Sequence, residues 1–110
     1  MKKIEAIIRK EKLERVKMLL ATLGYHGMTI AEVTGMGRRE RFPINWMSKG
    51  LGVLPKLKIE LVVNDDDVSQ VLSAIVKGAK TGEIGDGKIF VIPIEDVIRV
   101  STGDSGINAV

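Results

Sequence analysis

The chain has no cysteine and only one histidine, His26, in 110 residues. The missing thiols exclude disulfides, thiolate catalysis and cysteine-based metal sites, and their absence fits a cytoplasmic protein. His26 falls in Tyr25-His26-Gly27, where we expect a turn, and a lone histidine cannot supply a classical zinc site. The inventory for catalysis is poor, so we expect a protein that is not an enzyme and holds no metal.

Aromatic residues and long apolar runs are also scarce. Two Phe, one Trp and one Tyr are too few for the stacking platform with which a sheet reads single-stranded nucleic acid. No apolar run approaches the roughly 18 residues that cross a bilayer. The start, Met1-Lys2-Lys3, leads into an alternating segment without the pattern of a signal peptide. We expect neither nucleic acid as a partner nor insertion into a membrane.

The charge is small in sum but uneven along the chain. The net charge is +3, yet residues 1–50 carry eleven Lys or Arg against five acids, and residues 51–110 carry six against nine. A basic half suits phosphates, nucleic acid or a membrane surface. A solvated helix face and a charged loop explain the same pattern, so charge alone does not select a partner.

Hydrophobic periodicity predicts a single domain over residues 1–110, built from two strand–helix–strand units. Alternation over 3–9, 28–36, 54–63 and 88–92 predicts strands, and apolar stripes over 11–23 and from 68 onward predict helices. We expect the tail to add a helical turn and a final strand. This order predicts an α+β, ferredoxin-like βαββαβ sandwich, with a four-stranded antiparallel sheet and two helices on one face.

An acidic triplet, Asp65-Asp66-Asp67, precedes the second predicted helix. Asp67 and Gln70 have the spacing of a capping box, and acidic residues stabilise a helix N-terminus. We therefore interpret the triplet as a helix start and not as a metal site.

Two of the predicted strands are apolar on both faces, at Leu-Val-Val over 61–63 and Ile-Phe-Val-Ile over 89–92. Two helices cover only one face of a sheet, whereas continuous apolar runs indicate burial on both sides. Another surface must cover the second face. An oligomer with sheets packed at its centre is the simplest arrangement that does so.

Residues 38–53 lose all periodicity, and a gap of about 16 residues is long for so small a domain. Apolar side chains stand among basic ones there, namely Arg41, Phe42, Ile44, Trp46 and Met47. Trp, Phe, Met and Arg are enriched at the centres of protein interfaces. We expect a partner-binding loop; the alternative is a loop that folds onto its own oligomer and hides Trp46.

Two glycine-rich corners are flanked by cations. The first is Gly35-Met36-Gly37-Arg38-Arg39, and the second has three glycines in the six residues 82–87 and is followed by Lys88. Glycine lets backbone amides approach a polyphosphate, and Lys or Arg neutralises its charge. Neither corner has the spacing of a dinucleotide fingerprint or a Walker loop, so each taken alone is interpreted first as a hairpin or connecting turn, with phosphate binding as the alternative.

Taken together and in order, these segments resemble the PII family of signal-transduction proteins, over nearly the whole chain. The strongest match is the C-terminal signature Thr81-Gly82-Glu83-Ile84-Gly85-Asp86-Gly87-Lys88-Ile89-Phe90-Val91. The further matches are Ile7-Ile8-Arg9, His26-Gly27-Met28-Thr29, Gly35-Met36-Gly37-Arg38, Leu54-Pro55-Lys56 and Arg99 near Thr102-Gly103.

The resemblance implies a homotrimer whose three clefts between subunits bind ATP or ADP as effectors. It also implies that a T-loop, here about 38–53, contacts a protein partner such as a transporter or metabolic enzyme of nitrogen regulation. Carried over by position, Arg99 would reach in from the neighbouring subunit. The implied nucleotide-binding residues are Thr29, Gly35, Gly37, Arg38, Glu60, Gly85, Asp86, Gly87, Lys88 and Arg99.

The chain departs from the family pattern at three places. Arg39 stands where the family has a glutamine that helps hold magnesium beside 2-oxoglutarate. A guanidinium cannot ligate a cation, so we expect that sensing to be lost and Arg39 to contact an anion. The loop is about two residues short and has no tyrosine for uridylylation. Ser101 replaces a second basic residue near Arg99, which predicts a reduced preference for ATP over ADP.

Two other functions use the same predicted fold. A ferredoxin-like nucleic-acid-binding domain would use the basic first half, but it lacks the paired aromatics. An acylphosphatase-type enzyme would have its phosphate loop after the first strand, where Arg9-Lys10-Glu11-Lys12 offers no glycine.

Overall fold

Four strands form one sheet in the computed structural model, which describes residues 1–36 and 53–110. The strand order is β2-β3-β1-β4, and every neighbouring pair is antiparallel. The strands are β1 (Lys2–Ile8), β2 (Thr29–Met36), β3 (Val53–Val63) and β4 (Gly87–Pro93). All four lie within a few residues of the ranges that alternation predicts.

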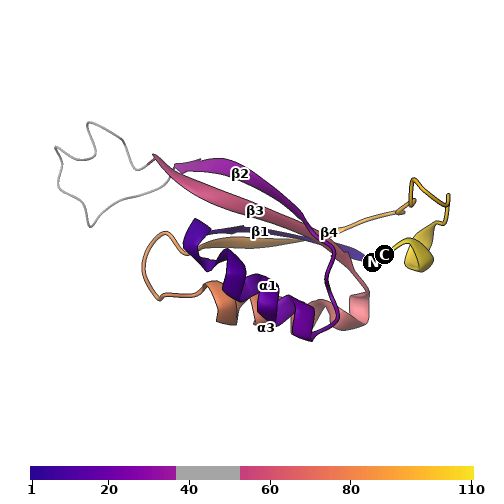
Figure 1. Ribbon diagram of the computed structural model, residues 1–110, viewed down its shortest axis with the longest axis horizontal. Coiled ribbons are helices and arrows are strands. Elements are labelled where there is room, and N and C mark those ends of the chain that lie inside the picture. Colours follow the sequence, from indigo (N-terminus) through magenta and orange to yellow (C-terminus); the bar gives the residue numbers. More distant parts are fainter. Residues whose placement is uncertain (37–52) are drawn as a thin grey trace.

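Two helices, α1 (Leu13–Thr22) and α3 (Val68–Ala79), cover one face of this sheet (Figure 1). Each follows a 3₁₀ turn, η1 (Lys10–Lys12) and η2 (Asp65–Asp67) respectively. These turns were not predicted, because a stripe of apolar residues does not separate the two kinds of helix. The arrangement confirms the predicted ferredoxin-like fold.

The core lies between the helices and the covered face of the sheet. β1 and β3 contribute every second residue to it, and the helices contribute residues at three- and four-residue spacing, as the sequence pattern requires. The core residues on these elements are Ile4, Ala6, Ile8, Leu57, Ile59, Leu61, Val63, Val16, Leu20, Val71, Ala74, Ile75 and Ala79.

The predicted capping box at the start of α3 is wrong. Asp67 makes no side-chain cap; its carboxylate accepts a hydrogen bond from the hydroxyl of Tyr25, across 42 residues of sequence. Asp65 is ion-paired with the amino group of Met1 at 2.9 Å and with Lys2 at 3.2 Å. Burial and the bond to Asp67 raise the pKa of Tyr25 to about 12. The acidic turn therefore ties chain segments together and does not cap the helix.

The uncovered face of the sheet carries both ion pairs and apolar side chains. Phe90 and Ile92 lie on this face, 47% and 37% exposed. Lys58 lies between Glu5 at 3.5 Å and Glu60 at 3.1 Å, and Lys3 contacts Glu60 at 2.9 Å.

The prediction that two strands are apolar on both faces is confirmed for β4, and it is confirmed more weakly for β3, because one apolar residue of the predicted trio lies on the open face. In β3, Leu61 and Val63 point into the core, and the register places only Val62 of this trio on the open face, opposite Lys3.

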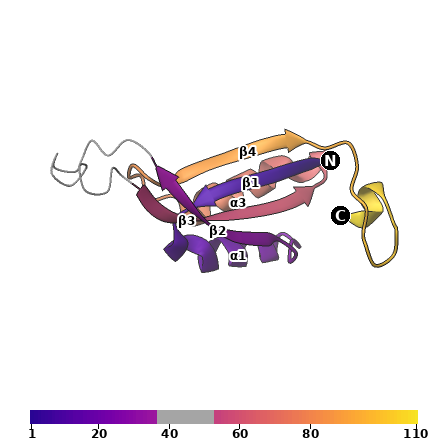
Figure 2. The same ribbon diagram turned by 90° about the horizontal axis from the view of Figure 1, so that it is seen from above.

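The tail leaves β4 at the end of the sheet that lies away from the loop preceding this strand (Figures 1 and 2). It holds the 3₁₀ turn η3 (Gly106–Ala109), and the final strand predicted there is reduced to one bridge between Ile98 and Ser105. Val100 in this tail is 99% exposed. No helix among the described residues is long and apolar enough to cross a membrane.

Candidate functional site

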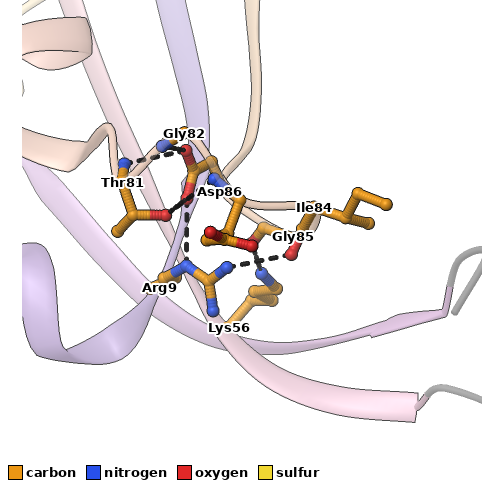
Figure 3. Close-up of polar contacts among 8 residues, drawn as sticks. Arg9, Lys56, Thr81, Gly82, Ile84, Gly85 and Asp86 are labelled. Atoms are coloured by element: carbon orange, nitrogen blue, oxygen red, sulfur yellow. Dashed lines mark hydrogen bonds and ion pairs between the residues drawn. The ribbon is translucent and has the colours of Figure 1, made fainter. Parts of the chain in front are cut away.

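The glycine-rich loop between α3 and β4 is organised around one carboxylate, that of Asp86 (Figure 3). Asp86 Oδ2 accepts hydrogen bonds from the backbone N–H groups of Thr81 and Gly82, both at 2.8 Å. Its Oδ1 accepts bonds from the hydroxyl of Thr81 and from Arg9 Nε, the latter at 3.1 Å. The loop is thus closed by a side chain from its own C-terminal end.

These contacts also set the charge of Asp86. Burial acts to raise the pKa of its carboxyl group, but the hydrogen bonds from Thr81, Gly82 and Arg9 together outweigh it and hold that pKa well below the usual range. Asp86 is therefore ionised throughout the physiological range.

Two cationic side chains, one just after β1 and one on β3, bond this loop to the rest of the domain. Arg9, directly after β1, reaches Asp86 with Nε and the carbonyl oxygen of Ile84 with Nη2 at 2.9 Å. Lys56 on β3 is only 6% exposed, and its ammonium donates to the carbonyl oxygen of Gly85.

The first glycine corner meets the second through Lys56. A Cβ atom on Gly35 would lie 3.3 Å from Lys56 Cγ, so the missing side chain leaves room for the stem of Lys56, whose ammonium bonds to Gly85. Lys88, the second residue of β4, is exposed. Within the described part of the chain it forms no ion pair. Gly35, Gly85, Gly87 and Lys88 therefore belong to one end of the molecule.

A pocket of about 350 Å³ adjoins this end. Its lining includes the buried Ile8, Ile75 and Ala79, and Lys80 and Lys88 also border it. An apolar floor bordered by two lysine residues suits a ligand that has both an apolar part and an anionic part.

Thr29 and Glu60 form a second group of predicted residues. They are opposite each other in the register of β2 and β3, and they border a pocket of about 340 Å³ with Val97 and Ala109 of the tail. Bonds from Lys3 and then from Lys58 lower the pKa of Glu60. Its carboxylate is therefore held in ion pairs on the open face of the sheet.

The two groups are far apart in a single chain. Thr29 and Gly35 are six residues apart on β2, which corresponds to about 20 Å at the usual rise of an extended strand. The glycine-rich loop precedes β4 and Arg99 follows it, so the length of this strand separates them (Figures 1 and 2). One chain does not bring the predicted residues into one site.

The other predicted residues of the first glycine corner and the T-loop lie outside the described residues. They are Gly37, Arg38, Arg39, Arg41, Phe42, Ile44, Trp46 and Met47.

Sequence reasoning gave no role to three residues that build this site: Arg9, Lys56 and Thr81. Each lies inside a segment that carries the family resemblance, and that was the available signal. Arg9 is 77 residues from Asp86 and Lys56 is 29 residues from Gly85, so no local pattern pairs them.

A ferredoxin-like sandwich with a carboxylate-closed glycine loop beside lysines defines a small α+β domain with a glycine-rich corner flanked by cations. The family model "Nitrogen regulatory protein P-II" matches residues 1–104, and the chain belongs to this family of nitrogen regulatory signalling proteins.

Similar proteins match over nearly their full length. The chain is 52% identical to nitrogen regulatory protein P-II 2 of Methanothermobacter thermautotrophicus, covering 100% of this chain and 97% of the relative. It is 48% identical to nitrogen regulatory protein P-II of Nostoc punctiforme, covering 100% of both chains. A crystal structure of Arabidopsis thaliana PII bound to citrate superposes with a TM-score of 0.81 at 41% identity, covering 98% of this chain and 87% of that chain.

Proposed function

We propose that the chain is a regulatory protein, not an enzyme, that forms a homotrimer and binds ATP or ADP where subunits meet. The nucleotide would lie between the Lys88 end of one copy and the Arg99 end of its neighbour. Its occupancy would change the conformation of the T-loop, about 38–53, and so control a protein partner.

The observation that carries this proposal is the separation of the two groups of residues within one chain. A ligand that contacts both Lys88 and Arg99 needs two copies, because β4 separates these residues. The tail also presents apolar side chains to solvent on both sides of Arg99: Ile98 is 65% exposed and Val100 is 99% exposed. Exposed apolar groups of this kind indicate a contact surface.

The chemistry of the Lys88 end suits a polyanion. Backbone N–H groups in a glycine-rich turn and an exposed ammonium are the groups that hold phosphates. The Arabidopsis protein of the same fold was crystallised with citrate bound, which supports the view that this fold accommodates a compact polyanion.

Mixing two variants tests whether the site is shared. Lys88→Gln and Arg99→Gln should each weaken ATP binding by about tenfold or more, because each removes a charged hydrogen bond to phosphate. Copies of the two variants, denatured together and refolded, should regain clefts in which Lys88 and Arg99 are both intact. Calorimetric titration with ATP measures this recovery, with Lys77→Gln, an exposed lysine on α3, as control.

If each variant alone loses binding but the refolded mixture regains none, the site is not shared. No heat with ATP or ADP from the folded wild-type protein, or a lone subunit in sedimentation, would contradict the proposal as a whole.

The choice between ATP and ADP should depend on the residue at position 101. Ser101 stands where the family has a second basic residue beside Arg99, so the outer phosphate has one charged partner fewer. We expect the ATP and ADP dissociation constants to lie within about tenfold of each other, and Ser101→Arg to shift the ratio toward ATP. Titrations of both nucleotides measure it, and strong selection for ATP by the wild type would contradict the prediction.

The binding of small effectors should depend on Arg39. Its guanidinium has no acceptor for magnesium, so we propose that magnesium-dependent binding of 2-oxoglutarate is lost and that Arg39 contacts an anion instead. Uridylylation in the loop is lost with its tyrosine, since the chain's one tyrosine is Tyr25.

A further inference from the structure

The carboxylate of Asp86 has no acceptor capacity left for a ligand. It receives four hydrogen bonds, from Thr81 N, Thr81 Oγ1, Gly82 N and Arg9 Nε, and an ionised carboxylate offers about four lone-pair sites. Its negative charge would repel a phosphate. Asp86 is thus badly suited to the direct nucleotide contact that its position in the signature implies.

Arg9 is engaged in the same way. Its planar guanidinium bridges Asp86 Oδ1 at 3.1 Å and the carbonyl oxygen of Ile84 at 2.9 Å (Figure 3). Two donors in a fixed fork define both the distance and the orientation of what they hold. Because Arg9 directly follows the last residue of β1, it fixes the loop to the rigid sheet.

We propose that Asp86 and Arg9 are positioning residues, which do not touch the nucleotide but hold the loop in its binding conformation. Asp86 closes residues 81–86 into one turn, and Arg9 anchors the turn beside β1. Gly87 and Lys88 follow Asp86 directly, so the anchored turn fixes the position from which the Lys88 side chain extends. This inference rests on the proposed nucleotide site and assigns two of its residues a new role.

A positioning role and simple electrostatics predict opposite effects of Asp86→Asn on the binding of ATP. Asp86→Asn removes a negative charge near a polyanion, so charge alone predicts tighter binding of ATP. In Asn an NH2 group, which cannot accept a hydrogen bond, replaces one carboxylate oxygen. Either the N–H groups of Thr81 and Gly82 or the donors Thr81 Oγ1 and Arg9 Nε then lose their acceptor. Loss of loop order therefore predicts weaker binding.

The test is a double-mutant cycle followed by calorimetry with ATP. We expect Asp86→Asn to weaken ATP binding by about tenfold or more and Arg9→Met to weaken it by a comparable factor. We expect the double variant to bind within about twofold of the weaker single variant, since both act through one anchor. Asp66→Asn on η2 and Arg15→Met on α1, both exposed, are the matched controls.

A second readout needs no ligand. Amide hydrogen exchange at Thr81 and Gly82 should accelerate in Asp86→Asn and in Arg9→Met while the core strands stay protected. Because Arg9→Met leaves three of the four bonds to Asp86 in place, it tests the proposal even if Asp86→Asn does not fold.

Binding of ATP by Asp86→Asn that equals or exceeds wild-type binding would overturn the proposal, and so would additive losses in the double variant, which indicate that Arg9 contacts phosphate itself. Both results leave the proposed function intact. A wild-type protein that binds neither ATP nor ADP would instead overturn the proposed function and this inference with it.

Discussion

Replacement of Gly87 by alanine should lower the free energy of unfolding by roughly 2–5 kcal/mol, the sum of a left-handed backbone and a steric clash. Gly87 has φ of 107°, and a Cβ atom there would lie 1.7 Å from the carbonyl oxygen of Ile7. That oxygen belongs to β1, which pairs with β4 at this point. Any side chain therefore forces the two strands apart.

The same clash should abolish binding at the Lys88 end. Gly87 is the first residue of β4 and Lys88 the second, so a displaced strand start moves the ammonium group with it. Urea unfolding monitored by circular dichroism measures the stability, and calorimetry with ATP measures the binding.

Gly82→Ala is the matched control for Gly87→Ala. Gly82 has φ of 87°, but a Cβ atom there meets nothing within 4 Å. Gly82→Ala should lower the free energy of unfolding only by the cost of a left-handed backbone, about 1–2 kcal/mol. Equal losses in the two variants would show that the contact with Ile7 does not decide the stability.

The fold could be predicted from the sequence because burial imposes a visible pattern. β1 and β3 place alternate residues in the core, and α1 and α3 place a stripe there, so the two periods mark the elements directly. The boundaries were less certain where local hydrogen bonding decides them, as in the 3₁₀ turns η1 and η2. The tail strand was overestimated because Ile98 and Val100 are apolar, but only one bridge forms.

The site could be predicted in composition but not in contacts. Glycines near arginines marked the first corner and glycines near a lysine the second, and the family signature named Asp86 as a member of the second. The donors that occupy Asp86 include Arg9, 77 residues away, and only the folded sheet brings the end of β1 to this loop. For the same reason the capping box was wrong although α3 does begin after the acidic triplet: Tyr25, 42 residues from Asp67, donates to the carboxylate that a local pattern assigned to a helix cap.

Phe90→Lys should dissociate the proposed homotrimer into single subunits. Phe90 lies on the sheet face that the helices leave uncovered and is 47% exposed there. If three copies bury this face, each lysine must be desolvated in the interface, which costs on the order of 3 kcal/mol per copy. Sedimentation velocity at micromolar protein concentration should show the mass fall to that of one chain.

The substitution is chosen so that the isolated subunit still folds. Phe90 is opposite Glu5 in the register of β1 and β4, and a lysine directly across from a carboxylate is a favourable cross-strand pair. A glutamate at the same position would face Glu5 and destabilise the sheet itself. The melting temperature of the variant subunit therefore tells lost assembly from lost folding.

Val76→Lys is the control, because Val76 is 48% exposed but lies on α3, on the opposite side of the molecule. The two side chains expose the same share of their surface, so a general effect of replacing an apolar group by a charge should be equal in both. Dissociation by Phe90→Lys alone places the subunit interface on the open face of the sheet. Dissociation by neither would mean that the ion-paired face of Glu5, Lys58 and Glu60 is exposed to solvent, and dissociation by both would mean that the added charge acts without regard to its place.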